Sequence, residues 1–191
     1  MPNLLLIMIL LLAWTTPAHA IKIGFRAPPF TLPNTHGELI SLSDFKGKHV
    51  VLEWFNPDCR TVQRHYQKKN MRQLALNYMG REVIWLAINS TYYMTQEDNK
   101  RWKDVNLLHY RLLNDSSGEV ARLYQVQNTP QMYVINPSGI LIYMGAIDND
   151  PIGNQPQPFN YVQAALEDSL AGRSVTYPQT QPYGCLVKYK Y

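Results

Sequence analysis

Apolar residues fall into short runs that alternate with more polar stretches along the chain. The runs 49–55 and 83–88 are β-branched and bounded by turn residues, which is the pattern of buried central strands. The stretch between them, 58–79, lacks Gly and Pro and predicts a helix. Shorter helices are predicted over 95–105 and 116–124. This alternation of strands and helices predicts an α/β layer architecture.

Four further apolar runs form two pairs, and turn residues separate the members of each pair. The pairs are 30–33 with 39–42, and 131–136 with 140–145. Pro, Ser, Asn and Gly in the connections are typical of tight turns, so each pair predicts an antiparallel hairpin. A final helix is predicted over 159–170 and is closed by Gly172. The chain thus begins its fold with a small hairpin and ends it with a helix.

The amino terminus has the features of an export signal. Residues 4–14 are uninterrupted apolar residues, and Ala18-His19-Ala20 supplies small residues for cleavage. A retained membrane anchor is the alternative, but the run is shorter than the roughly 20 residues that a spanning helix needs. We therefore expect a signal peptide at 1–20, an exported protein in the periplasm or outside the cell, a single domain over 21–174, and a carboxyl-terminal tail over 175–191.

The charge distribution narrows the possible partners. The formal net charge is +4, and the basic residues are dispersed without a stripe or an aromatic-interleaved run. Nucleic-acid binding is therefore disfavoured. The histidines are not accompanied by the paired cysteines of thioredoxin-fold copper chaperones, and His65 alone is better explained as a packing residue. We expect neither a metal site nor a cofactor.

Two cysteines carry the candidate chemistry, and Cys59 is the better placed of them. It follows the strand 49–55 directly and stands at the first turn of the next helix, where backbone N–H groups and the helix dipole favour a thiolate. Arg60 and Arg64 add positive charge, whereas Asp58 opposes it. A reactive thiol is predicted, and a buried residue or half of a structural disulfide is the alternative. Glu53, within the strand, is either a proton carrier or a structural carboxyl.

The second cysteine, Cys185, lies in a tail where apolar and polar residues alternate. Such alternation is typical of an edge strand or an extended strap. Cys185 could resolve a sulfenic acid or mixed disulfide at Cys59. The same bond could instead be a permanent staple that closes a long loop, and an unpaired Cys185 is a third alternative. The sequence leaves open whether the two sulfurs approach each other.

Several segments resemble the alkyl hydroperoxide reductase/thiol-specific antioxidant (AhpC/TSA) family, and specifically an exported bacterial group with one active-site cysteine and a second near the carboxyl terminus. The segments are 24–32 (GFRAPPFTL), 42–48 (LSDFKGK), 52–59 (LEWFNPDC), 128–135 (NTPQMYVI), 143–148 (YMGAID) and 182–189 (PYGCLVKY). The resemblance implies a thioredoxin fold. In that fold a central mixed sheet is flanked by helices, here with an amino-terminal hairpin and an extended tail.

The resemblance also implies a site. Thr129-Pro130 matches the cis proline that faces the active cysteine in thioredoxin-fold oxidoreductases, leaving a backbone edge where a partner peptide can pair. Together with Asn56 and Pro57, these residues are expected to contact substrate. Val62 stands where a thioredoxin has its second cysteine, so dithiol exchange within one helical turn is excluded.

The chain also departs from the pattern of residues that peroxiredoxins carry around their active cysteine. Leu52 and Asn56 stand where peroxiredoxins carry a Pro and a Thr that hold peroxide, and Pro130 stands near the position of their thiolate-stabilising Arg. Arg60-Thr61 also replaces two residues of the Pro-Phe-Val that usually follows this cysteine in related chains. Leu52 and Asn56 indicate that the usual peroxide pocket is absent or rebuilt, and Pro130 favours thiol-disulfide exchange over peroxide reduction.

Three functions follow from the sequence, in this order. The first is a thiol-disulfide oxidoreductase that uses Cys59, with Cys185 as resolving thiol, on protein or small-molecule thiols and disulfides. The second is a thiol peroxidase. The third is a noncatalytic thioredoxin-fold binding module held by a structural disulfide. The sequence does not identify the external reductant.

Overall fold

The computed structural model describes residues 21–190, so the predicted signal peptide lies outside the described residues. The elements are β1 (Thr31–Pro33), β2 (Leu39–Ser41), the 3-10 helix η1 (Leu42–Phe45), β3 (His49–Phe55), α1 (Arg60–Gln67), α2 (Asn70–Tyr78), β4 (Val83–Asn89), α3 (Gln96–Val105), β5 (Arg111–Asn114), α4 (Glu119–Leu123), β6 (Asn128–Thr129), β7 (Gln131–Ile135), β8 (Leu141–Gly145), α5 (Tyr161–Leu170) and β9 (Cys185–Leu186). Among these residues, no helix is long and apolar enough to cross a membrane.

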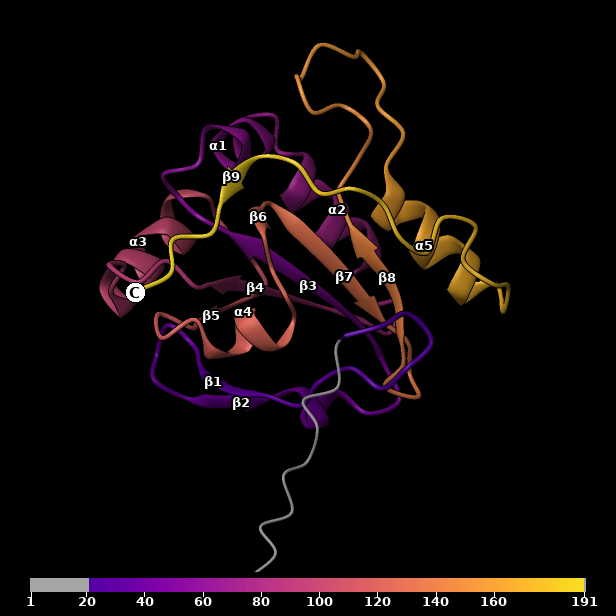
Figure 1. Cartoon of the computed structure of the whole chain (residues 1–191), viewed down its shortest axis with the longest axis horizontal. Coiled ribbons are helices and arrows are strands. Elements are labelled where there is room, and N and C mark those ends of the chain that lie inside the picture. Colours follow the sequence, from indigo (N-terminus) through magenta and orange to yellow (C-terminus); the bar gives the residue numbers. More distant parts are fainter. Residues whose placement is uncertain (1–20, 191) are drawn as a thin grey trace, which may run out of the picture.

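A five-stranded mixed sheet forms the centre of the molecule (Figure 1), in the order β5-β4-β3-β7-β8. β3 and β4 are parallel, as are β4 and β5, whereas β7 is antiparallel to both β3 and β8. All seven residues of β3 are buried, which explains why the strand is apolar apart from His49 and Glu53. The predicted α/β class, thioredoxin fold and two hairpins are confirmed.

The sheet separates two apolar cores because successive side chains of a strand point to opposite faces. Val51 and Phe55 enter one core with α1, α2 and α5, and Cys59 belongs to the same core. Leu52 and Trp54 enter the other, together with the β1–β2 hairpin and α4. In Figure 1 these layers lie above and below the sheet. Leu52 therefore packs on the face of the sheet opposite to that of Cys59.

Two helix predictions were too long. The stretch 58–79 is not one helix, because it breaks between α1 and α2 at Lys69, which has a left-handed backbone (φ 58°). The helix expected over 116–124 shortens to α4. There the Asp115 carboxylate accepts the N–H groups of Val120 and Ala121, so the preceding residues form a turn that caps the helix.

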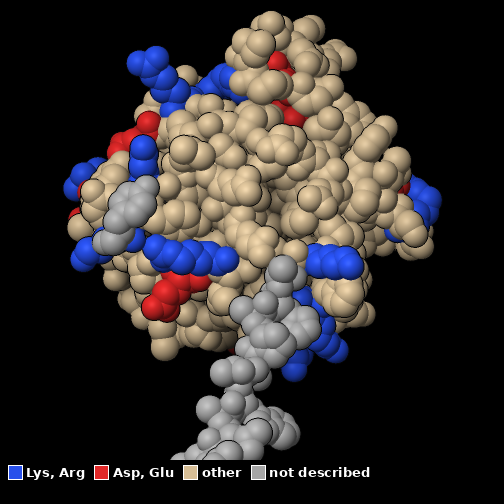
Figure 2. Space-filling view, viewed as in Figure 1, with Lys and Arg blue, Asp and Glu red and all other residues tan. Residues whose placement is uncertain are grey.

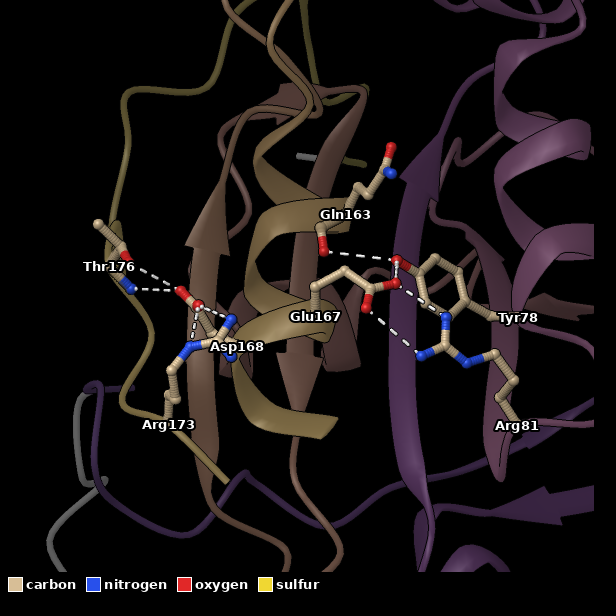
Figure 3. A network of polar contacts seen from close by, with 7 residues as sticks. All are labelled: Tyr78, Arg81, Gln163, Glu167, Asp168, Arg173 and Thr176. Carbon is tan, nitrogen blue, oxygen red and sulfur yellow. Dashed lines mark hydrogen bonds and ion pairs between the residues drawn. The ribbon is translucent and has the colours of Figure 1, made fainter. Parts of the chain in front are cut away.

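Polar contacts attach α5 to α2 (Figure 3). The Glu167 carboxylate accepts a hydrogen bond from the Tyr78 hydroxyl at 2.7 Å and pairs with the Arg81 guanidinium at 2.8 Å. One residue further along, the Asp168 carboxylate accepts the backbone N–H and hydroxyl of Thr176 and also pairs with Arg173. These bonds lower the pKa of Asp168 to about 2. The network thereby fixes the turn that leads from α5 into the tail.

The tail runs back past the carboxyl end of β3 (Figure 1), and at its end the Lys190 carbonyl accepts a hydrogen bond from Arg122 of α4. It first passes β8, where Met144 donates to the Pro178 carbonyl and Thr180 donates to the Met144 carbonyl. Beyond that point β9 pairs with β6, and Lys188 accepts the backbone N–H of Tyr92. The tail is therefore the extended strap that its alternating pattern predicted.

Candidate active site

Cys59 is the amino-terminal capping residue of α1, immediately beyond the carboxyl end of β3. Its position is set by a tight turn, in which the Asn56 side chain accepts the N–H of Asp58 at 2.9 Å and the Asn56 carbonyl accepts the N–H of Cys59 at 3.0 Å. Only 1% of the Cys59 side chain is exposed. The sulfur therefore lies at the positive end of a helix with little access to water.

Cys59 and Cys185 are joined by a disulfide, although 126 positions separate them in sequence. Their Cα atoms are 5.8 Å apart, within the ordinary range for such a bond. Cys185 is partly buried at the start of β9, and residues 21–190 contain no unpaired cysteine. The structure thus brings together the two sulfurs whose distance the sequence left open.

The Thr129–Pro130 peptide bond is cis, as predicted, and both residues are buried next to the disulfide. The carbonyl oxygen of Thr129 lies 3.2 Å from Sγ of Cys59. Thr129 and the preceding Asn128 form β6, which pairs antiparallel with β9 so that Thr129 lies opposite Cys185. The backbone edge that was expected to receive a partner peptide is occupied by the protein's own tail.

Asn56 and Pro57 shape the turn before Cys59. Asn56 is 2% exposed, and the carbonyl of Pro57 accepts the side-chain amide of Gln63 at 2.8 Å. Val62 of α1 is fully buried, so the thiol of the capping residue Cys59 has no second thiol on this helix. These contacts account for how the turn is held, and the expected contact of Asn56 and Pro57 with substrate stays a prediction.

Glu53 is fully buried in the core on the same side of the sheet as Cys59. Its carboxylate accepts hydrogen bonds from the Tyr66 hydroxyl at 2.6 Å, the Trp85 indole at 2.7 Å and the Tyr110 hydroxyl at 3.3 Å. Burial raises the pKa of Glu53, and the three hydrogen bonds oppose that rise. These bonds give the carboxyl a structural role, since none of its partners is a cysteine.

A polar contact that the sequence did not predict attaches the tail two residues before Cys185. The Tyr183 hydroxyl donates to the Asp148 carboxylate and lies 3.2 Å from Nε2 of His65. The side-chain amide of Asn70 lies 2.9 Å from Nδ1 of the same ring. Burial lowers the pKa of His65, which keeps the ring neutral near pH 7. We refer to Tyr183, Asp148 and His65 as the tail latch.

The surface that the tail crosses carries little charge. Figure 2 shows a face whose middle lacks Lys, Arg, Asp and Glu, with the charged residues towards its edges. The tail contains no charged residue between Arg173 and Lys188. Tyr92, Tyr93 and Leu186 are 49%, 45% and 69% exposed, and Tyr93 donates to Asp58 beside Cys59.

The basic residues of α1 contribute less to the site than expected. The Arg64 guanidinium donates to the carbonyls of Asp150 and Pro151, which anchors the loop between β8 and α5. Arg60 is exposed. In the described part of the chain, no group of three or more His, Cys, Asp or Glu side chains is arranged to hold a metal ion. The chemistry that the site offers is that of its two sulfurs.

Known proteins resemble the chain over most of its length. It is 27% identical over 127 residues to the thiol-disulfide oxidoreductase ResA of Bacillus thuringiensis subsp. konkukian, and the aligned region covers 66% of this chain and 71% of ResA. It is 30% identical over 110 residues to the peroxiredoxin Bcp of Escherichia coli K12, covering 56% of this chain and 65% of Bcp.

The fold has a close structural counterpart as well. A hypothetical protein from Sinorhizobium meliloti 1021 superposes with a TM-score of 0.82 at 25% identity and covers 90% of this chain and 97% of its own. The family model of AhpC/TSA proteins matches residues 23–144, which include β1 to β7 and all but the last residue of β8. This match spans more than half of the chain. The chain belongs to the AhpC/TSA family.

Proposed function

We propose that the protein is a thiol-disulfide oxidoreductase in which Cys59 attacks client disulfides and Cys185 resolves the resulting mixed disulfide. The observation that carries this proposal is the Cys59–Cys185 bond, formed between a helix-capping cysteine and a tail cysteine beside a cis proline. Kinship with thiol-disulfide oxidoreductases supports it further. Cys59, Cys185, Thr129 and Pro130 form the proposed site.

The reaction transfers two electrons from the protein to the client. The Cys59 thiolate attacks one sulfur of the client disulfide, so that a Cys59–client disulfide forms and the other client sulfur leaves as a thiolate. The Cys185 thiolate then attacks Sγ of Cys59, forming the Cys59–Cys185 bond and releasing the second client thiolate. The client is reduced by two electrons and the protein is oxidised by two. An external dithiol returns the protein to its reduced form.

The helix cap supports the first step. Backbone N–H groups at the start of α1 and the helix dipole favour a thiolate at Cys59 over a thiol. The thiolate is the nucleophile of this step. Burial opposes ionisation, so the helix terminus offsets part of a desolvation cost.

The contacts of the tail support the second step. On either side of residues 183–187, Thr180 N–H donates to the Met144 carbonyl and Tyr92 N–H donates to the Lys188 carbonyl, and neither bond depends on the disulfide. They keep Cys185 near Cys59 after the bond is reduced. A tethered thiol acts at a high effective concentration, which favours intramolecular resolution over attack by a free thiol.

Export and domain organisation belong to the same proposal. We place the domain at 21–174 and the resolving tail at 175–191, with the protein acting outside the cytosol, where client disulfides persist. Its partners would be proteins or small molecules that carry thiols or disulfides.

A second function, thiol peroxidase, is favoured by the similarity to a peroxiredoxin. In that reaction peroxide oxidises the Cys59 thiolate to a sulfenic acid and releases water or an alcohol. Cys185 then condenses with the sulfenic acid and releases water, giving the same disulfide. A binding module would leave the bond unreacted.

Substitution of the resolving cysteine tests the proposal. We expect Cys185→Ser to accumulate a mixed disulfide with a small disulfide such as glutathione disulfide, because no tethered thiol remains to release it. Mass analysis under nonreducing conditions would place the adduct on Cys59, and Cys59→Ser is the matched control that forms none. An adduct-free Cys185→Ser protein that becomes a sulfenic acid with hydrogen peroxide would favour the peroxidase, and inertness in both assays would favour the binding module.

A further inference from the structure

The tail occupies the client edge in the geometry of a bound strand. Thr129 lies opposite Cys185 and Asn128 lies opposite Leu186, in antiparallel register. The Val187 N–H donates to the Gln127 carbonyl at 3.0 Å, which extends the pairing beyond β9. An extended peptide that adds a strand to a free backbone edge makes the same set of contacts. Residues 183–187 therefore display how a cysteine-bearing segment meets Cys59.

Gly184 lies directly against the backbone of Thr129 and the ring of Pro130. A methyl group added there would lie 3.0 Å from the carbonyl carbon of Thr129, 3.3 Å from Cδ of Pro130, and closer still to the carbonyl oxygen of Thr129. The obstacle is backbone and a proline ring, neither of which can turn aside as a flexible side chain would. Gly184 also has a φ of 114°, which L-residues with a Cβ rarely adopt.

The neighbouring position is open by contrast. Leu186 follows Cys185 and is 69% exposed, so the protein makes little contact with its side chain. Tyr183 stands two residues before the cysteine, and its hydroxyl contacts Asp148 and His65 in the tail latch. The steric restriction therefore falls on one side of the cysteine, at the residue directly before it.

We infer that Cys59 selects client segments with glycine directly before the reacting cysteine, and that residues 183–187 are the protein's own stand-in for such a segment. This inference rests on the proposed function, because it names the client class of the same exchange site. Any client residue with a Cβ at this position meets the Thr129 carbonyl and Pro130 and loses the pairing with β6. A small thiol compound, which needs no strand pairing, escapes the restriction.

The same geometry makes the tail and the client mutually exclusive. β6 has one edge beside Cys59, and β9 fills it in the oxidised protein. A client strand must therefore displace residues 183–187 before it can pair. When Cys185 attacks Cys59 and releases the client, residues 183–187 pair with β6 again. Release of the client and closure of the site therefore occur together.

Activated peptides test the selectivity on the full chain. The probe is the octapeptide Gln-Pro-Tyr-Gly-Cys-Leu-Val-Lys, blocked at both ends, with its cysteine in a disulfide with 5-thio-2-nitrobenzoate. Attack by Cys59 of the reduced Cys185→Ser protein joins Cys59 to the peptide sulfur and releases coloured thionitrobenzoate. Two matched peptides replace Gly by Ala, or Leu by Ala. Rates with β-mercaptoethanol correct each peptide for its intrinsic reactivity, and mass analysis confirms the adduct at Cys59.

We expect the corrected rate to fall at least about tenfold for Gly to Ala, the ratio for a difference of ~1.4 kcal/mol, and to stay within about twofold for Leu to Ala at the exposed position. The tail of the Cys185→Ser protein competes with all three peptides alike and does not affect these ratios. Equal corrected rates for the Gly and Ala peptides would overturn the inference while leaving the proposed function intact. No reaction with any peptide or with the small disulfide 5,5′-dithiobis(2-nitrobenzoate) would overturn both.

Discussion

Gly184→Ala is expected to slow formation of the Cys59–Cys185 disulfide at least tenfold. The added methyl meets the Thr129 carbonyl and the ring of Pro130, so β9 cannot reach its register with β6 and Cys185 is held away from Cys59. A loss of about 1.4 kcal/mol in the seated state is enough for a tenfold effect. The rate is measured by oxidising the reduced protein with glutathione disulfide, quenching with acid and counting free thiols by mass.

Gly172→Ala is the matched control for this substitution. Gly172 also has a positive φ, of 72°, but a methyl group there would meet no atom within 4 Å. Both variants therefore carry backbone strain, and Gly184→Ala alone carries the steric conflict with Thr129. We expect Gly172→Ala to oxidise at close to the wild-type rate. Equal rates for Gly184→Ala and Gly172→Ala would show that seating of β9 does not control the reaction.

Reduction of the disulfide is expected to lower the free energy of unfolding by about 4–5 kcal/mol. The bond joins residues 126 positions apart, and the chain-entropy model assigns roughly 4.7 kcal/mol to a loop of about 100 residues. Urea unfolding of the wild-type protein with and without a dithiol measures the difference. The double variant Cys59→Ser/Cys185→Ser controls for direct effects of the dithiol and should not respond to it. A difference below about 1 kcal/mol in the wild type would contradict this expectation.

This stabilisation bears on how the bond can cycle. By thermodynamic linkage, folding stabilises the disulfide relative to the dithiol by the same free energy by which the disulfide stabilises the folded protein. About 4.7 kcal/mol corresponds to a reduction potential roughly 100 mV lower in the folded than in the unfolded protein. Stabilisation of the Cys59 thiolate by α1 acts in the opposite direction, because it favours the reduced form. The balance between tail and helix therefore sets which clients the protein can reduce.

Much of the fold could be predicted because local pattern and tertiary environment agree. The strand β3 is buried on both faces and is apolar apart from His49 and Glu53, and the β7–β8 hairpin carries its turn residues. The break between α1 and α2 could not be predicted in this way. Lys69 adopts a left-handed conformation that its sequence neighbours do not signal, since neither Gly nor Asn stands at that position.

The site was predictable in part for a similar reason. Cys59 and Thr129-Pro130 adjoin strands whose placement the pattern fixes. The path of the tail was not predictable, because its latch joins Tyr183 to residues 35 and 118 positions earlier, Asp148 and His65. One local signal was present, in that a glycine inside an alternating strand often marks a close backbone approach. Gly184 is such a residue.

A single-turnover measurement on the wild-type protein tests the central claim most directly. Reduced protein is mixed with the disulfide-linked dimer of the octapeptide Gln-Pro-Tyr-Gly-Cys-Leu-Val-Lys, samples are quenched with acid, and client thiols and the Cys59–Cys185 bond are quantified by mass analysis over time. We predict that each client disulfide lost is matched by one Cys59–Cys185 disulfide gained, and that a dithiol then restores both thiols in the folded protein. Client reduction without formation of this bond, or a bond that the dithiol cannot open while the protein stays folded, would contradict it.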